Sequence, residues 1–457
     1  MSSRISMNVT GLDTETIIQE LMKIERRPLV TLESKQQLLN DRKTAWNAIR
    51  AKLDSIALKM KPLLDRSIFE TKAAKASDTG ILSARISGTA SLGDFDIEII
   101  RLAQSHVVQS AVFAQGPDEA LGLMGTLSLG LEGLETGPAA IEIAESDSLN
   151  SIMSKINAAE GTGVKASVFE VSPSEYCLIL TAESTGKVID YAEDLTDSMG
   201  QPATLGLATA RDRAKAAFNI NGISFTRDTN TISDAIPGVS FDLLKAGKTN
   251  LSVDYDNDAV VTAVKEFIAE YNSLLDMAAK YNSWDSTTRK AGLLFGDPLL
   301  QRLLSQIRQT IFSEISQEFP GFQFIGQIGI STGSLGSYSR EGKISLDEAK
   351  LNEALNTDRN AVASLLSEDQ AGSEGILVNL QKALQMYVSY DGFLPVKDAQ
   401  LESQDKDISR QIENLERRLE LRLANLKRQF TALEGLLAQM DSQGLWLAQQ
   451  VQGLYGN

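Results

Sequence analysis

The sequence predicts an α+β multidomain protein. Coiled-coil helices form both ends, a helical-bundle region and central antiparallel β-rich domains lie between them, and the N- and C-terminal segments pair. Two observations predict this class. Apolar residues recur every seven positions near both termini, but every second position through much of the chain between them. The 457 residues also exceed one ordinary core and suggest about three domains.

The N-terminal segment is predicted to form a short helix and then a long one. Asp13 can cap the first helix, which carries Ile17, Leu21 and Ile24 as an apolar stripe. Pro28 suits the first turn of the second helix, where no backbone N–H is needed. The second helix repeats two apolar rows at seven-residue spacing, which predict packing along another helix. These rows are Leu32, Leu39, Trp46, Leu53 and Met60, and Ile49, Ile56 and Leu63.

Residues 71–255 change to the two-residue period of β-strands, and one helix interrupts them. Asn221 and Gly222 separate two apolar runs and predict a two-residue hairpin. Ser148 is expected to cap the helix. The glycine-rich stretch 116–137 is expected to be a loop with short strands.

Helical spacing returns after residue 258 and predicts the core-packing helices of a bundle. An Asp-Pro pair at 297–298 is expected to start one helix. Residues 345–348 form a capping-box pattern that predicts the start of another. Thr357 or Asp358 is expected to cap a further helix.

The C-terminal segment carries heptads that answer those near the N-terminus. One row is Ile412, Leu419, Leu426, Leu433, Met440 and Leu447, and the companion row is Leu423, Phe430 and Leu437. Two interpretations stay open, because heptads alone do not distinguish coiled-coil partners. The ends form an intramolecular helical hairpin only, or they pair and also meet other copies. The expected interface consists of Leu39, Trp46, Ile49, Leu53, Ile56, Leu419, Leu426, Phe430, Leu433, Leu437 and Met440.

The charge of the chain is acidic and uneven. Its 60 Asp and Glu outnumber 44 Lys and Arg, and the net charge of −16 disfavours nucleic-acid binding because phosphate backbones are repelled. Residues 111–200 hold 15 acidic residues and 3 lysines, so 3 − 15 = −12 of that charge lies there. This distribution suggests a solvent-facing module on an associating stalk, with a simple contribution to solubility as the alternative.

The chain contains only one histidine, His106, and only one cysteine, Cys177. This scarcity excludes most familiar catalytic and metal sites, because those sites need several such residues. Lys248 and Thr249 follow a glycine as in a phosphate loop, but Asp242 takes the place of the required glycine. We therefore expect no enzyme, no cofactor and no metal site. No apolar run approaches the roughly 18–20 residues of a membrane span, and the first residues lack the apolar core of a signal peptide.

Several short motifs, in order along the chain, resemble one known family: the flagellar filament-capping proteins, also called the hook-associated protein 2 family. Each motif is weak alone, but their order over most of the chain is specific. The motifs are Gly11-Leu12-Asp13-Thr14 with Leu21-Met22-Lys23-Ile24 and Pro28-Leu29, Lys155-Ile156-Asn157-Ala158-Ala159 with Gly163-Val164-Lys165-Ala166, Phe218-Asn219-Ile220-Asn221-Gly222, Ala235-Ile236-Pro237-Gly238-Val239, Gly342-Lys343-Ile344-Ser345-Leu346-Asp347-Glu348, and Met440-Asp441-Ser442-Gln443.

The resemblance implies a secreted, non-enzymatic protein at the tip of the bacterial flagellar filament, exported unfolded without a cleaved signal peptide. It implies a cap that helps flagellin fold and polymerise. The implied partners are further copies in a homo-oligomeric ring, usually a pentamer, together with flagellin, hook–filament junction proteins and a flagellar export chaperone. The expected domains are a coiled-coil stalk (1–70 with 396–457), a helical leg domain (257–395), a β-rich domain (71–120 with 210–256) and an acidic outer β-rich domain (121–209). The outer domain contains the motif Lys155-Ile156-Asn157-Ala158-Ala159 with Gly163-Val164-Lys165-Ala166, which looks like one shared by flagellins and hook-associated proteins.

Two other functions stay open from the sequence. An adhesin would bind mucin or host surfaces through the exposed central domains, and this role is compatible with capping. A cytosolic coiled-coil scaffold would have no effect on flagellin secretion. We also expect the terminal segments to be poorly ordered in isolated subunits, because Gly435 and Gly444 weaken the last helical turns.

Overall fold

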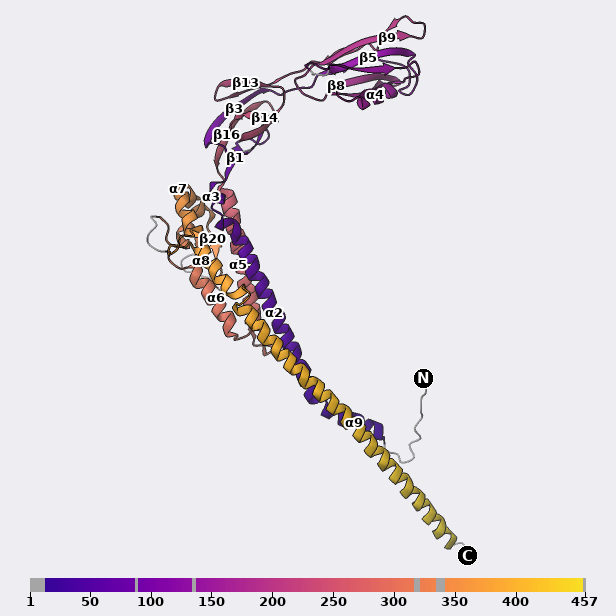
Figure 1. The fold of residues 1–457 in the computed structure, drawn as a ribbon, viewed down its shortest axis with the longest axis vertical. Helices are drawn as coiled ribbons and strands as arrows, with labels where there is room; N and C mark the ends of the chain where they lie inside the picture. The colour runs from indigo at the N-terminus through magenta and orange to yellow at the C-terminus, as the bar shows by residue number, and fades with distance from the viewer. Residues whose placement is uncertain (1–12, 87–88, 134–136, 316–320, 334–341, 455–457) are drawn as a thin grey trace. The chain divides into compact units, whose positions relative to one another are not determined.

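A computed structural model of the chain describes residues 13–86, 89–133, 137–315, 321–333 and 342–454 (Figure 1). It contains two compact units. Unit 1 joins residues 1–69 to 257–457, and unit 2 is residues 70–256. The predicted α+β class, with antiparallel sheets inserted between paired terminal segments, is confirmed. The predicted domain boundaries at residues 120, 209 and 395, which would divide the two units further, stay predictions. Gly11 and Leu12 of the first family motif, and the stalk ends at 1–12 and 455–457, lie outside the described residues.

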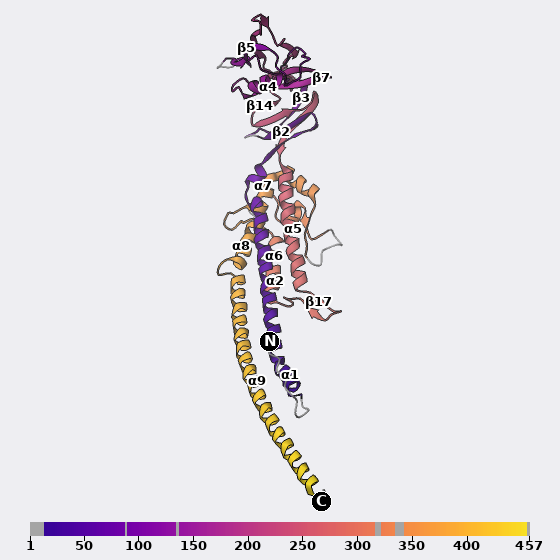
Figure 2. The ribbon, with the colours of Figure 1, turned by 90° about the vertical axis from the view of Figure 1, so that its right-hand side faces the viewer.

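In the part of unit 1 that the structure describes, helices predominate and two short strand pairs accompany them. Its core helices include α2, α5 and α8, which lie side by side (Figures 1 and 2). The helices are α1 (Thr14–Glu25), α2 (Arg27–Leu64), α3 (Ser67–Glu70), α5 (Asn257–Tyr281), α6 (Pro298–Ile311), η1 (Ile325–Ile328), α7 (Glu348–Ser367), α8 (Ile376–Val388) and α9 (Phe393–Leu454). The strand pairs are β17 (Trp284–Asp285) with β18 (Lys290–Ala291), and β19 (Ile330–Ser331) with β20 (Ser345–Leu346).

Helix starts in unit 1 follow from local capping chemistry. Asp13 and Asp297 cap α1 and α6 as predicted, each by accepting a backbone hydrogen bond from the first turn. The predicted capping box at 345–348 was wrong, because Ser345 lies in β20 and Asp347 is the cap, accepting from Lys350 N at 3.2 Å. The predicted start of a further helix at Asp358 is confirmed: its φ of −152° interrupts α7, and its side chain accepts from Ala361 N at 2.9 Å.

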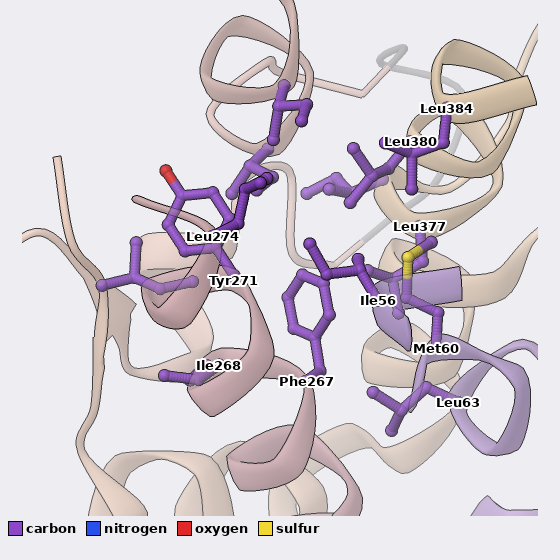
Figure 3. Close-up of a cluster of buried hydrophobic side chains, with 14 of the residues drawn as sticks. Ile56, Met60, Leu63, Phe267, Ile268, Tyr271, Leu274, Leu377, Leu380 and Leu384 are labelled. Carbon is purple, nitrogen blue, oxygen red and sulfur yellow. The ribbon is translucent and has the colours of Figure 1, made fainter. Parts of the chain in front are cut away.

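The core of unit 1 joins α2 to α5 and α8. Figure 3 shows side chains from these three helices meeting in one apolar cluster. Tyr271 is fully buried, and its hydroxyl donates to the carbonyl oxygen of Gly342 at 3.0 Å, so burial leaves no unpaired hydroxyl. The labelled members are Ile56, Met60 and Leu63 of α2, Phe267, Ile268, Tyr271 and Leu274 of α5, and Leu377, Leu380 and Leu384 of α8.

Unit 2 contains two β-sandwiches with separate cores. The first pairs a sheet of order β1-β16-β3-β12-β13 with a sheet of order β14-β15-β2, and Phe218 meets Phe241 edge-on between them at 5.9 Å. The predicted hairpin is confirmed, because Asn221 and Gly222 take φ values of 48° and 80° between β12 and β13. The strands are β1 (Lys72–Ala76), β2 (Leu82–Ile86), β3 (Gly93–Arg101), β12 (Ala216–Ile220), β13 (Ile223–Arg227), β14 (Thr231–Ile236), β15 (Val239–Leu243) and β16 (Gly247–Tyr255).

The second β-sandwich pairs sheets of order β10-β9-β5-β6 and β11-β4-β8-β7, and one helix, α4, completes its core. The predicted cap is confirmed: Ser148 accepts from Ser151 N at 3.2 Å. The expectation of a loop with short strands at 116–137 was wrong, because β5 is a nine-residue strand there. The elements are β4 (Val107–Gln109), β5 (Leu123–Leu131), β6 (Ala139–Ile143), α4 (Leu149–Ala158), β7 (Val164–Ser172), β8 (Glu175–Ala182), β9 (Ile189–Asp197), β10 (Pro202–Ala203) and β11 (Ala208–Arg211).

Candidate assembly interface on the terminal helices

A small apolar seam joins the two ends of the chain. Its buried members are Met22 of α1, Leu29 of α2, and Leu419 and Leu426 of α9. Half-buried apolar side chains border it on both sides. We call this cluster the terminal seam. Within the described residues it contains four buried side chains, so the pairing of the ends seen there rests on far less buried apolar surface than the core of unit 1. The bordering residues are Ile18, Ile412, Leu415, Leu423 and Phe430.

Polar pairs fix the direction and register of the pairing. Gln36 Nε2 donates to Asp405 Oδ1 at 3.1 Å and to Ser409 Oγ at 2.8 Å. From one pair to the next, the residue number on the N-terminal helices rises while that of its partner on α9 falls, so the two segments run antiparallel. The other pairs are Lys43 Nζ with Asp398 Oδ1 (3.7 Å), Arg422 Nε with Glu25 Oε1 (3.4 Å), and the hydroxyl of Thr14 with Glu434.

A groove opens beside the terminal seam, with a volume of about 550 Å³. Apolar side chains from α1, α2 and α9 line it, among them Ile18, Val30 and Leu423. The charged side chains around it are Glu15, Lys23, Arg26 and Lys427. The groove is therefore an apolar cleft with a largely basic rim.

Both terminal helices leave large apolar side chains exposed. The predicted stripe of Ile17, Leu21 and Ile24 faces solvent, because α1 turns Ile18 and Met22 towards α9 instead. Helix α9 continues past α1 (Figures 1 and 2), and its last turns carry apolar residues that are 46–69% exposed. We call these the distal row. They are Leu433, Leu436, Met440, Leu445, Trp446, Leu447 and Val451.

The structure separates the predicted interface residues into three groups. Trp46, Ile49, Leu53 and Ile56 are buried in the core of unit 1, and Leu39 is half-buried against it. Leu419 and Leu426 are buried in the terminal seam, which Phe430 borders. Leu433 and Met440 are exposed in the distal row, and Leu437 beside them is half-buried.

The first group therefore does not meet the other two, and antiparallel register is the reason. Residue 36 already lies opposite 405–409, so residues 39–56 lie opposite the start of α9 and the other bundle helices. Residues 419–430 lie opposite α1 and the first turns of α2. The heptads did not indicate Met22 and Leu29. The four-residue spacing from Ile18 to Met22 is an apolar pattern of a helix face and could have indicated Met22. It competes with the stripe that begins at Ile17.

The histidine and the cysteine that were considered for catalysis and metal binding both belong to the second β-sandwich. His106 and Cys177 are both buried in unit 2, and burial lowers the pKa of the His106 imidazole and raises that of the Cys177 thiol. Among the residues that the structure describes, no cluster of three or more His, Cys, Asp or Glu side chains could hold a metal ion. None of the helices in the described ranges combines the length and apolarity needed to span a membrane.

Family models and curated relatives that match the sequence indicate the same protein family. A family model for the C-terminus of flagellar hook-associated protein 2 matches residues 214–442, and one for its N-terminus matches residues 10–106. The flagellar hook-associated protein 2 of Escherichia coli is 25% identical over 472 aligned residues, covering 98% of each chain. The A-type flagellar hook-associated protein 2 of Pseudomonas aeruginosa is 24% identical and covers 100% of this chain and 98% of its own.

A solved structure shares the fold. The crystal structure of the flagellar cap protein FliD from Escherichia coli matches with a TM-score of 0.51, at 24% identity, over 78% of this chain and 99% of that chain. The C-terminal family model alone matches half of the chain, and the N-terminal model matches a separate segment. The chain therefore belongs to the flagellar hook-associated protein 2 family.

Proposed function

We propose that this protein forms the cap at the distal end of the bacterial flagellar filament and promotes the folding and polymerisation of flagellin. The observation that carries the proposal is the exposed apolar surface of the terminal helices, made of the distal row of α9 and the outer stripe of α1. An isolated chain gains nothing from this exposure, whereas an assembly would bury it. Its relatives of similar length are named flagellar hook-associated protein 2, which supports the same role.

This surface supports the first two of the proposed partners, further copies of the chain and flagellin. Further copies of the chain would bury part of it in a homo-oligomeric ring, for which we propose five subunits, and flagellin would meet the remainder at the filament tip. Hook–filament junction proteins and a flagellar export chaperone complete the proposed set. The protein would act outside the cell, after export without a cleaved signal peptide. The stalk, leg, first β-rich and acidic outer domains predicted above would then serve as separate parts of the cap.

A deletion strain provides the test. Replacing Leu433, Leu436 and Met440 with Gln together removes the first three residues of the distal row without touching the terminal seam. We expect the strain carrying this variant to be non-motile and to release flagellin monomer into the medium, like a strain whose protein ends at residue 400. Restored swimming and normal filaments with either variant would overturn the proposal.

A matched control separates loss of assembly from a general effect of placing glutamine at an exposed apolar position. Met199→Gln makes the same chemical change at a turn of unit 2 that is more exposed than any residue of the distal row. We expect this variant to restore motility fully. Equal amounts of each variant must reach the medium, as measured by immunoblot, so that a failure of export is not mistaken for a failure of capping.

A further inference from the structure

Two exposed aromatic rings lie on the hairpin of β17 and β18 in unit 1. Trp284 is 54% exposed and Phe295 is 52% exposed, and their ring centroids lie 5.9 Å apart at an interplanar angle of 44°. Figure 2 shows this hairpin standing out from the side of the helices beyond the end of α5. We call residues 282–296 the aromatic hairpin. Exposed tryptophan and phenylalanine side chains of this kind are typical anchors of protein–protein contacts.

The aromatic hairpin is held rigidly. Asp285 accepts hydrogen bonds from the backbone of Thr287 at 2.8 Å and of Thr288 at 3.2 Å, which closes the turn. Asn282 Oδ1 accepts from Gly296 N at 2.9 Å and so ties the two ends of the hairpin together. In addition, Arg42 of α2 donates to the carbonyl oxygen of Leu293 at 3.1 Å. A preorganised surface loses little conformational entropy when it binds.

The surroundings of the two rings are basic. Residues 280–296 contain Lys280, Arg289 and Lys290 against one acidic residue, Asp285, a net charge of 3 − 1 = +2. All three cationic residues are exposed. The carboxylate of Asp285 is engaged in the turn, and these hydrogen bonds lower its pKa. A partner for this surface should be apolar at its centre and acidic around it.

Unit 2 carries a surface of that description. In the sheet β11-β4-β8-β7, Ala166 and Val168 of β7 pack in the core, so Phe169, which follows Val168 along the strand and pairs with the buried Cys177 of β8, points outwards. The bridge between Phe113 and Tyr176 places Val112 on the same outward row. Val112, Phe169 and Val171 are 51–54% exposed. We call these three residues the outer patch.

The surroundings of the outer patch are acidic. Glu175 lies opposite the end of β7 and is exposed, whereas Glu170, next to Phe169, is exposed on the other face of that strand. The one cation of β7, Lys165, lies two outward positions away from Phe169. Residues 111–200 as a whole carry the net charge of −12 counted above. The outer patch and the aromatic hairpin therefore complement each other in both polarity and charge.

We propose that the aromatic hairpin of one copy docks on the outer patch of a second copy. The contact joins two different surfaces of the same chain, so it is heterologous and leaves an unused hairpin at one end and an unused patch at the other. Repetition of such a contact gives a closed ring or an open chain. The proposal does not depend on a flagellar role, because the purified chain alone is sufficient to test it.

The test uses two full-length variants and their mixture. Trp284→Ala with Phe295→Ala removes the hairpin anchors, and Phe169→Ser with Val171→Ser removes the patch. Sedimentation velocity at low ionic strength should show self-association of the unchanged chain, weakened about tenfold or more in each variant. Mixing the two variants should restore one heterodimeric contact, because one chain supplies the hairpin and the other the patch. Added salt should weaken it.

The remaining outcomes are also decisive. An unchanged chain that stays monomeric, or association that neither variant weakens, overturns the proposal and assigns any assembly to other surfaces. Variants that change the sedimentation coefficient without any dependence on concentration indicate a contact within one chain, which also overturns it. Ile223→Ser, at an exposed apolar position of β13, is the matched control and should leave association unchanged. Circular dichroism of each variant checks that both units remain folded.

Discussion

The Nδ1 atom of His106 accepts a hydrogen bond from the backbone N–H of Ile189 at 3.1 Å. His106 precedes β4 and Ile189 begins β9, so this bond joins the two sheets of the second β-sandwich. The imidazole is only 4% exposed, and its Nε2 lies 3.3 Å from Thr209 Oγ1. Nδ1 can accept a hydrogen bond only while it carries no proton. The hydrogen bond from Ile189 therefore forms only with the neutral form of His106.

The stability of the second β-sandwich should fall as the pH falls from 7 to 5. Burial lowers the pKa of His106 in the folded chain below its unfolded value of about 6.5, while the smaller effects of Asp212 and Arg213 oppose each other. Its stabilising contribution is therefore complete above about pH 6.5 and is lost as the pH falls below that value. Thermal unfolding followed by circular dichroism at several pH values measures this loss.

His106→Asn is the control for this titration. Its carboxamide oxygen can accept the bond from Ile189 but does not titrate between pH 5 and 7. We expect the variant to lose less stability over that interval than the unchanged protein. The same decline in both proteins would show that other groups cause it. Carboxylates titrate below the interval from pH 7 to pH 5. The pKa of Asp147, for example, is lowered below the ordinary value of 3.8.

The ion pair between Lys52 of α2 and Glu270 of α5 should stabilise unit 1 measurably. The two charged atoms lie 2.8 Å apart, each side chain is about a quarter exposed, and the hydrogen bond from Lys52 is the main reason that the pKa of Glu270 is lowered. A double-mutant cycle with Lys52→Ala and Glu270→Ala should give a coupling of about 1 kcal/mol in urea unfolding. The pair Lys23–Glu20 is far more exposed, and its cycle should give clearly less. Equal couplings would contradict this ranking.

Leu419→Ala and Leu53→Ala should affect different parts of unit 1. Leu53 is buried in the core, so its truncation should lower the free energy of unfolding by about 2–5 kcal/mol. Leu419 belongs to the terminal seam, so its truncation should release α1 and residues 412–430 and leave the core intact. Hydrogen exchange measured by mass spectrometry distinguishes the two outcomes. Leu421→Ala, on the exposed side of α9, should change neither region.

The heptads show how far sequence reasoning extends here. The seven-residue spacing of α2 predicted the burial of Trp46, Ile49 and Leu53. These side chains lie on one face of the helix, so they are removed from water whichever helix packs against that face. It could not predict that α5 and α8 join α9 as partners, since every helix of the bundle offers a similar apolar stripe. Antiparallel register then decides which residues meet, and the long-range pairs that set it, such as Gln36 with Asp405, have no local signature.

Glycine misled the sequence-based prediction in unit 2 for a related reason. The stretch 116–137 was expected to be a loop, yet Gly125 lies inside β5. Its φ is +138°, and a Cβ there would lie 2.1 Å from the carbonyl oxygen of Asp194 on β9. Glycine is required at this position because a neighbouring strand comes too close for a side chain, and nothing in the local sequence reports that neighbour.

Gly125→Ala should therefore destabilise the second β-sandwich strongly. The variant combines a backbone conformation that alanine rarely adopts with a clash against backbone, which cannot move without breaking the pairing of β5 with β9. Gly122→Ala is the matched control, because Gly122 also has a positive φ, of 69°, but no atom lies within 4 Å of an added Cβ. The control should cost only about 1 kcal/mol, and Gly125→Ala clearly more, in urea unfolding. Equal costs would show that backbone conformation alone selects glycine in β5 and that the approach of β9 can relax.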